Sequence, residues 1–381
     1  MKSDVLIIGG GVIGLSIARE LHKRGVRRIT IVDRGVAGYE SSWAAAGMLA
    51  PNIETDTNDD FHRFGMKAAD LYPDLADALR SETSVDIHLD QAGTLCVAFN
   101  EAELAELDET FQRQIRRDVT VERLSGTDIR DIEPSISPVA RGGLFYPSDW
   151  QVENRKLVQA LRTFAEINEI RMVENSEVDR LITDGKRVVG ARTAGGEMHA
   201  DATILATGAW TSLIKIGDSA VPVSVRPIRG QMISFETGER KIRRVIYSHR
   251  GYVVPRANGR VLVGATVEDV GFDKRTTAEG VNSLRSAAVE IVSALEQFAV
   301  ADSWSGLRPF VADGLPVIGN VPGYDDLFVA TGHYRNGILL APLTGKIIAE
   351  KITGTAESDY FRVFGAERFS TAVVANTHGS V

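Results

Sequence analysis

A cluster of glycines near the N-terminus has the residue types and spacing of a phosphate-binding turn. Gly9, Gly11 and Gly14 fit the pattern G-x-G-x-x-G, and Asp33 follows Gly14 by 19 residues. In this pattern the glycines permit a tight turn, a close approach of the backbone to a pyrophosphate, and close packing of a helix on a strand. Asp33 would accept hydrogen bonds from ribose hydroxyls and would repel a 2′-phosphate. The positive charge of the neighbouring Arg34 would offset a small part of that repulsion. A glycine-rich turn without a ligand is the alternative.

The elements around these glycines are those that the motif requires. Residues 5–8 are a continuous apolar run typical of a buried parallel strand. A helix is predicted from the glycines to residue 23 or 24, because Ile13, Ile17 and Leu21 fall four apart on one face. Gly25 is well placed to end it, and residues 29–32 form the second strand. The sequence therefore opens with a βαβ unit that positions Asp33.

A second polar turn lies near the other end of the chain. Residues 327–340 read LFVATGHYRNGILL, which predicts a strand, a polar turn and then a helix. The positive end of that helix would suit the negative charge of a reduced flavin. The first βαβ unit alone does not decide between NAD and FAD, and an ordinary βα unit is the alternative for this segment.

The intervening chain predicts a mixed fold. We expect an α/β plus α+β protein, with a discontinuous Rossmann-like domain for a dinucleotide and a second, mostly antiparallel β-sheet domain for substrate. The first would comprise residues 1–80, 150–215 and 305–365, the second residues 81–149 and 216–304, and residues 366–381 a loose tail. Further helices are expected at 59–79, 101–117, 154–168, 277–299 and 342–352, and strands at 94–99, 177–183, 187–194, 197–200, 202–206, 252–255, 260–264 and 327–330.

Composition excludes several classes of function. The 381 residues carry a net charge of −8, so a broad basic surface for nucleic acid is not expected. The single cysteine, Cys96, excludes an internal disulfide, and we read it as a buried apolar residue. The histidines have no metal-ligand spacing, and we predict no metal. No apolar run is long enough to span a membrane, and residues 5–8 leave no room for a leader before them, so we expect a cytoplasmic protein.

Several motifs together resemble the family of D-amino-acid oxidase and glycine oxidase. The resemblance begins with residues 9–14, Asp33 and residues 41–49 (SSWAAAGML), and includes residues 206–210 (ATGAW). Residues 264–269 (GATVED), 306–309 (GLRP) and 332–342 (GHYRNGILLAP) are similar to the glycine oxidase branch. It covers residues 5 to about 350. It implies bound FAD, oxidation of an amine beside a carboxylate to an imine, transfer of electrons to oxygen with release of hydrogen peroxide, and a homo-oligomer.

The resemblance also implies roles for individual residues. Arg308 would clamp the substrate carboxylate, Tyr252 would contact it through the hydroxyl, and Arg335 would lie close enough to touch substrate. The planar fork of an arginine suits a carboxylate better than a lysine does. Structural ion pairing of Arg308 and simple packing of Tyr252 are the alternatives. The residues expected at FAD are Gly9, Gly11, Val12, Ile13, Gly14, Asp33, Arg34, Ser41, Ser42, Ala46, Gly47, Met48, Val178, Gly208, His333, Tyr334, Arg335, Asn336, Gly337, Ile338 and Leu339.

We assign no general base, because a neutral amine can itself drive hydride from its Cα to the flavin. We expect FAD to be noncovalent, since no cysteine lies near the C-terminal flavin turn. Glycine, sarcosine, D-alanine and D-proline are all candidate substrates, and thiamine biosynthesis is a pathway that glycine oxidases often serve. A dehydrogenase that reduces a quinone or a partner protein, or a non-catalytic flavin-binding subunit, are the alternative functions. The acidic residues 54–60 are expected to form a solvated loop at the entrance.

Overall fold

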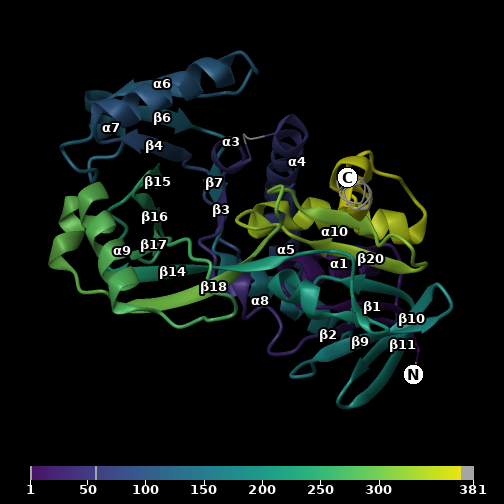
Figure 1. The fold of residues 1–381 in the computed structure, drawn as a ribbon. Helices are drawn as coiled ribbons and strands as arrows, with labels where there is room; N and C mark the ends of the chain where they lie inside the picture. The colour runs from purple at the N-terminus through teal and green to yellow at the C-terminus, as the bar shows by residue number, and fades with distance from the viewer. Residues whose placement is uncertain (1, 56–57, 370–381) are drawn as a thin grey trace, which may run out of the picture.

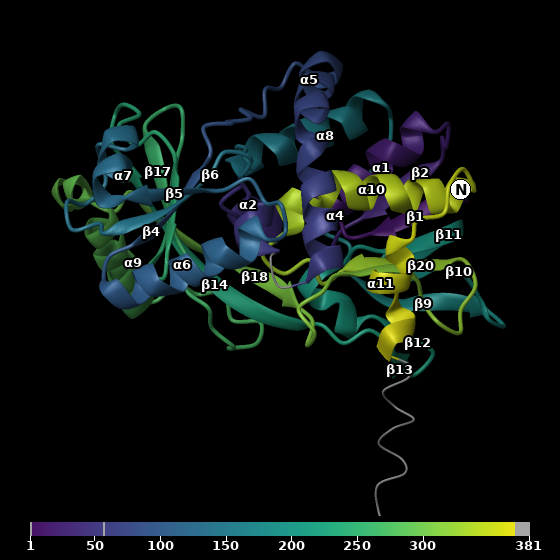
Figure 2. The same ribbon diagram turned by 90° about the horizontal axis from the view of Figure 1, so that it is seen from above.

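Two large β-sheets organise the protein. The computed structural model describes residues 2–55 and 58–369. Figures 1 and 2 show the lobe that carries the first sheet, with β1, β11 and β20, beside the lobe that carries the second sheet, with β4, β14 and β16. This arrangement confirms the predicted fold class.

The first sheet has a parallel centre. Its order is β13-β12-β9-β10-β11-β1-β2-β8, with β20 paired to β11 and β19 to β20. Strands β8, β2, β1, β11 and β20 run parallel, whereas β9, β10 and the first half of β11 form an antiparallel meander. The bounds are β1 (Ser3–Ile8), β2 (Ile29–Val32), β8 (Arg171–Val173), β9 (Val178–Asp184), β10 (Arg187–Thr193), β11 (Gly196–Leu205), β12 (Lys215–Ile216), β13 (Ser219–Ala220), β19 (Val317–Asn320) and β20 (Leu327–Thr331).

Both faces of this sheet are covered, which explains the continuous apolar run of β1. Val5 and Ile7 pack into a cluster with helices, whereas Leu6 and Ile8 pack on the other face against the meander. The helices of this lobe are α1 (Val12–Lys23), α4 (Asp59–Asp70), α5 (Tyr72–Thr83), α8 (Asn154–Ile167), α10 (Gly337–Thr353) and α11 (Tyr360–Phe364), with short 3₁₀ turns η1 (Gly208–Leu213) and η3 (Ala366–Phe369). Helix α1 packs against α8 and α10.

The second sheet is mostly antiparallel and has the order β18-β14-β17-β16-β15-β4-β6-β5. Its strands are β4 (Thr94–Ala98), β5 (Glu122–Ser125), β6 (Gly142–Tyr146), β14 (Arg226–Glu236), β15 (Val245–Ser248), β16 (Gly251–Pro255), β17 (Arg260–Gly264) and β18 (Asp302–Phe310). Its helices are α6 (Glu101–Ile115), α7 (Gly126–Ile132) and α9 (Ala278–Ile291), followed by η2 (Ser293–Gln297). Between the sheets lie α2 (Ser41–Ala44), α3 (Pro51–Glu54) and the pair β3 (Met48–Leu49) and β7 (Trp150–Gln151).

The two faces of the second sheet have different roles. Val253 of β16 packs in the cluster that α9 covers. Its neighbours Tyr252 and Val254 point to the opposite face, where they pack with Ala44 and Ala46 from the segment between β2 and β3. The alternation of β16 therefore turns Tyr252 toward the first lobe.

The structure departs from the predicted elements at four places. The strands expected at 197–200 and 202–206 are one strand, β11, which pairs with β10 in its first half and with β1 and β20 in its second. The helix expected at 59–79 divides into α4 and α5 because Pro73 has no backbone N–H to continue it. The helix expected at 277–299 ends at Ile291, and η2 follows.

The fourth departure is the start of α10, which begins at Gly337 rather than at Pro342. Pro342 cannot donate a hydrogen bond to the carbonyl of Ile338, four residues before it. The hydroxyl of Tyr72, which is fully buried, donates to that carbonyl instead. A side chain from α5 thus allows the helix to run through the proline.

The predicted domain boundaries stay a prediction, since the sheets share long connections. Residues 366–369, expected in a loose tail, form η3, where Ala366 is buried and Arg368 pairs with Asp313. The rest of that tail, residues 370–381, lies outside the described residues. Within residues 2–55 and 58–369, no helix is long and apolar enough to cross a membrane.

Candidate functional site

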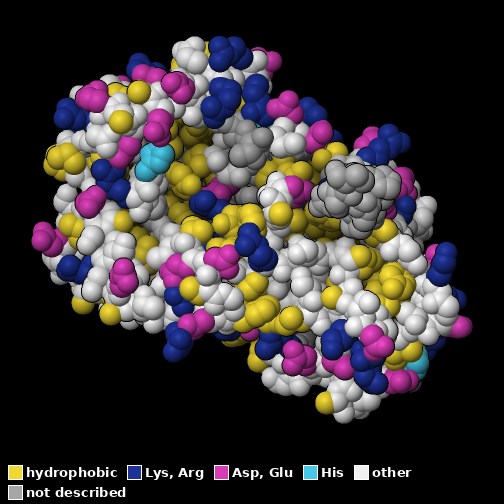
Figure 3. Space-filling view, viewed as in Figure 1, with side chains coloured by type: hydrophobic (Ala, Val, Ile, Leu, Met, Phe, Trp, Pro, Cys, Tyr) yellow, Lys and Arg dark blue, Asp and Glu magenta, His cyan; other side chains and the backbone are white. Residues whose placement is uncertain are grey.

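A cavity of about 340 Å³ lies between the two lobes. The space-filling view shows a hollow there, lined by hydrophobic side chains with charged groups among them (Figure 3). Of the predicted site residues it is lined by Gly9, Gly11, Val12, Ile13, Asp33, Arg34, Ser41, Ser42, Ala46, Gly47, Met48, Val178, Gly208, Tyr252, Arg308, His333, Tyr334, Arg335, Asn336, Gly337 and Ile338. Gly14 and Leu339 do not line it.

The glycine turn leaves no room for other side chains. Gly9 has φ +102°, and a Cβ there would lie 2.3 Å from the carbonyl oxygen of Ala206 in the neighbouring strand. A Cβ on Gly14 would lie 2.0 Å from the carbonyl oxygen of Gly9, so Gly14 serves the packing of α1 on β1. The backbone N–H of Val12 donates to the hydroxyl of Ser42 at 2.9 Å, which ties the start of α1 to α2.

Asp33 organises the same turn from the end of β2. One carboxylate oxygen accepts the backbone N–H of Gly10 at 2.7 Å and the other accepts that of Gly35 at 2.8 Å. A carboxylate oxygen can accept more than one hydrogen bond, so lone pairs remain for ribose hydroxyls. Arg34 instead lies over the ring of Trp210, 4.7 Å from its centroid. The geometry fits an adenine dinucleotide laid across the glycine turn.

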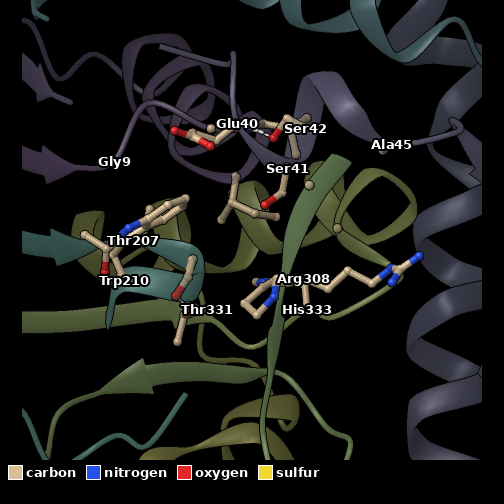
Figure 4. A pocket seen from close by; sticks show the side chains of 18 of the residues that line it. Gly9, Glu40, Ser41, Ser42, Ala45, Thr207, Trp210, Arg308, Thr331 and His333 are labelled. Atoms are coloured by element: carbon tan, nitrogen blue, oxygen red, sulfur yellow. Dashed lines mark hydrogen bonds between the residues drawn. The ribbon is translucent and has the colours of Figure 1, made fainter. Parts of the chain in front are cut away.

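The segment from Ser41 to Met48 forms another wall and is held from behind. Arg256, which is buried, donates to the carbonyl oxygen of Ala46 at 2.7 Å. The amide of Asn154 donates to the carbonyls of Ser42 and Trp43 at 2.9 and 3.0 Å. Figure 4 shows Ser41 and Ser42 on one side of the cavity, Thr207 and Trp210 on another, and Arg308 and His333 on a third.

The turn before α10 places an uncharged histidine and a helix N-terminus at the cavity. Burial lowers the pKa of His333 to about 3, and its Nε2 lies 3.1 Å from the hydroxyl of Thr344. The imidazole is therefore neutral at physiological pH. Gly337 and Ile338 begin α10, where the first backbone N–H groups have no partner within the helix. This end of the cavity offers donors and a positive helix end, as we expected for a flavin.

Arg308 has the geometry of a carboxylate clamp. It lies on β18 opposite Ile228 of β14, and a Cβ added to Gly230, two residues further along β14, would be 2.3 Å from its guanidinium nitrogens. Its Nη1 donates to the carbonyl of Thr266 at 3.0 Å, and the Tyr252 hydroxyl nearby donates to the sulfur of Met232 at 3.3 Å. Burial raises the pKa of Tyr252, although Arg308 opposes that shift. Among the residues that the structure describes, no carboxylate lies within ion-pair distance of Arg308.

Arg335 differs from Arg308 because it already has an acidic partner. Its Nη2 donates to Glu54 Oε1 at 2.9 Å and to the Tyr247 hydroxyl at 3.1 Å. Burial acts to lower the pKa of Arg335, but Glu54 and Tyr247 outweigh it and hold the pKa above its usual range. The expected solvated loop at 54–60 is wrong at both ends. The Glu54 side chain is only 11% exposed and lies in this ion pair at the end of α3, and Asp59 and Asp60 form the first turn of α4; residues 56 and 57 lie outside the described residues.

Sequence reasoning missed several residues of the cavity wall, among them Glu40, Glu54, Trp210, Lys215, Gly230 and Met232. Trp210 stands in a motif that we had quoted, and Glu54 begins the acidic run, so both had a signal. The other four carry none, since nothing near them in sequence links them to the glycine turn. Cys96 lies in β4, and burial raises the pKa of its thiol to about 12.

A Rossmann-like sheet whose glycine turn and acidic strand end share one cavity with an arginine that has no acidic partner among the described residues is typical of a dinucleotide-dependent oxidoreductase. The chain belongs to the FAD dependent oxidoreductase family, whose model matches residues 4–351. FAD is the cofactor of this family, and the glycine turn and Asp33 fit it.

Relatives and solved structures agree with this assignment. The chain is 37% identical to a glycine oxidase of Geobacillus kaustophilus over 92% of this chain and 93% of the relative. It is 33% identical to a bifunctional ThiO/ThiG protein of Trichormus variabilis, over 97% of this chain and 55% of the relative. A crystal structure of glycine oxidase from Geobacillus kaustophilus aligns with a TM-score of 0.91 at 34% identity, covering 96% of this chain and 98% of that one. The chain is thus glycine-oxidase-like over nearly its whole length.

Proposed function

We propose that the protein is an FAD-dependent amino-acid oxidase that acts on glycine and small D-amino acids, with sarcosine as a further substrate. The overall reaction for glycine would be glycine, O₂ and water giving glyoxylate, ammonia and H₂O₂. The main support for this proposal is Arg308. Its guanidinium has no acidic partner among the described residues and lies in the same cavity as the segments expected to bind the flavin. A half-buried cation without an acidic partner favours an anion, and the substrate carboxylate would supply it.

The side chains around Arg308 would orient the substrate. The carboxylate would bind the guanidinium and the Tyr252 hydroxyl, which line the same cavity. The chemistry that bound FAD would supply is that of a hydride acceptor for the substrate Cα. His333 is neutral and faces Thr344, and Glu54 is paired with Arg335, so neither is poised as a base for a Cα proton. The protein's contribution is then positioning and exclusion of water, with the amine of the substrate neutral when it reacts.

The cofactor would be held without a covalent bond, because the only cysteine of the sequence lies in β4 with a buried, protonated thiol. A homo-oligomer stays a prediction from the resemblance, and a cytoplasmic location stays a prediction from the sequence.

Anaerobic addition of substrate to the holoenzyme tests the proposed function. Glycine, sarcosine, D-alanine and D-proline should each be offered, and at least glycine should bleach the flavin absorption. In air the same substrate should release peroxide in proportion to glyoxylate. Bleaching by none of the four would refute the proposal, and bleaching without peroxide would favour a dehydrogenase that passes electrons to a quinone or partner protein.

A further inference from the structure

The substrate end of the cavity holds two arginines that differ in charge balance. Arg308 has no carboxylate partner among the described residues, whereas Arg335 is paired with Glu54 at 2.9 Å. The side chain of Glu54 is 11% exposed and that of Arg335 is 32% exposed, so the pair lies where the cavity opens to the surface. Counting these three side chains, the site offers one net positive charge.

A pair of tyrosines brings the two arginines together. Tyr247 and Tyr252 are directly opposite each other on β15 and β16, with ring centroids 6.4 Å apart and an interplanar angle of 17°. Tyr252 and Arg308 line the same cavity, and the charge of Arg308 acts on the Tyr252 hydroxyl by opposing the rise in its pKa; Tyr247 accepts a hydrogen bond from Arg335 at 3.1 Å. Because cross-strand partners on one face are neighbours, the two guanidinium groups approach the same region from adjacent positions. A molecule with two carboxylates could reach both.

Glu54 is held in place rather than free to move aside. The buried carboxyl group of Asp149 accepts the backbone N–H of Asn52 and of Ile53, at 3.3 and 3.2 Å, and the Asn52 amide at 2.6 Å. The carbonyl of Asn52 accepts a further bond from Gln114 at 2.9 Å. Helix α3 is thereby fixed, and it presents Glu54 to Arg335.

We propose that Glu54 is a specificity-determining residue that restricts this site to substrates with one carboxylate, by occupying Arg335. A second carboxylate attached to the amine would meet a guanidinium that is already neutralised, and would be repelled by Glu54. Glycine, sarcosine and D-alanine have no second carboxylate and are unaffected by this barrier. This inference rests on the proposed function for the identity of the first carboxylate.

The test compares wild type with Glu54→Gln, which keeps an acceptor for Arg335 but removes the charge. The first readout is binding to the holoenzyme of acetate and of malonate, followed by the change in flavin absorption. The second is kcat/KM for glycine and for iminodiacetate, which would yield glyoxylate, glycine and H₂O₂ from one O₂ and one water. In Glu54→Gln the preference for the dicarboxylate should rise about tenfold or more in both readouts, the factor expected from one charge-assisted hydrogen bond.

Glu101→Gln is the matched control. Glu101 is 78% exposed on α6 and its loss changes the net charge by the same amount. The preference should not move in this variant, and it should return to the wild-type value in the double variant Glu54→Gln/Arg335→Gln. Should Glu54→Gln fail to fold, Arg335→Gln alone tests the idea, because an unpaired Glu54 should disfavour malonate relative to acetate.

A change of less than twofold in Glu54→Gln, an equal gain in Glu101→Gln, or a gain that persists without Arg335 would overturn the inference. Failure of the proposed function is a separate result, since a wild type that does not oxidise glycine still reports on Glu54 through acetate and malonate.

Discussion

The close packing of the Arg308 guanidinium against Gly230 gives the most specific prediction. In Gly230→Ala the new Cβ would lie 2.3 Å from Nη1 and Nη2 of Arg308, and ordinary contact begins at 3.4 Å, so the guanidinium must move by about 1.1 Å. The obstacle is the end of a flexible side chain, so the protein should fold and bind FAD. A displacement of about 1 Å of a positioning group lowers the reaction rate on the order of 100-fold. We therefore expect kcat/KM for glycine to fall by about that factor in Gly230→Ala.

Companion variants connect this loss to the carboxylate clamp. Arg308→Ala leaves a buried carboxylate without its partner, which costs about 2–5 kcal/mol, or roughly 30- to several-thousand-fold in kcat/KM. Arg308→Lys should recover only part of it, because an ammonium lacks the planar fork. In the Arg308→Lys background Gly230→Ala should cost much less, since no guanidinium remains to be displaced.

The assay is steady-state kcat/KM with oxygen consumption as the signal and with FAD content measured in each variant. Gly195→Ala is the matched control, because its Cβ would meet only the Thr193 hydroxyl at 3.6 Å in a turn of the meander. Near-normal kcat/KM for glycine in Gly230→Ala, within about threefold, would show that the position of Arg308 is not what limits the reaction.

Four further results are expected. Asp33→Ala should weaken FAD binding by about 1.5–3 kcal/mol, measured by titrating apoprotein with FAD, and an affinity unchanged within about twofold would contradict the ribose role. Acid precipitation should release the flavin into the supernatant, whereas yellow colour in the pellet would indicate a covalent bond. The pKa of His333 is lowered in the folded protein, so protonation of the unfolded chain destabilises the fold as the pH falls below about 6.5. Between pH 7.5 and pH 5 the free energy of unfolding, measured with denaturant, should therefore fall by about 2 kcal/mol more in the wild type than in His333→Gln. Tyr72→Phe should lower the free energy of unfolding by about 1–3 kcal/mol, because the Ile338 carbonyl loses its hydrogen-bond donor. The loss should be smaller in a Pro342→Ala background, where a backbone N–H can replace the hydroxyl, and the same loss in both backgrounds would exclude this role.

The cofactor half of the protein was predictable because its signals are local. The apolar run of β1, the glycine spacing and the acid at the end of β2 lie within the first 33 residues, and each follows from the geometry of one βαβ unit. The polar turn before α10 was recognisable for the same reason. Where prediction failed within this half, a distant side chain was responsible, as when the Tyr72 hydroxyl allows α10 to begin before Pro342.

The substrate half was predictable only in part, because its geometry depends on contacts between remote segments. Arg308 was found through its motif, but the space that receives it is made by Gly230 on another strand. Arg335 was expected close to substrate, but its partner Glu54 comes 281 positions earlier in the chain. No periodicity or spacing links such residues, so only the folded structure brings them together.

The charges at the substrate end are therefore set by buried anchors that never touch the substrate. Burial raises the pKa of Asp149 to about 8, even though N–H groups of Asn52 and Ile53 oppose the shift. These hydrogen bonds hold α3, and with it Glu54, from behind. The ion pair of Glu54 with Arg335 then cancels one arginine and leaves Arg308 as the cation for a single carboxylate. Selectivity among amine substrates follows from this balance as much as from the size of the cavity.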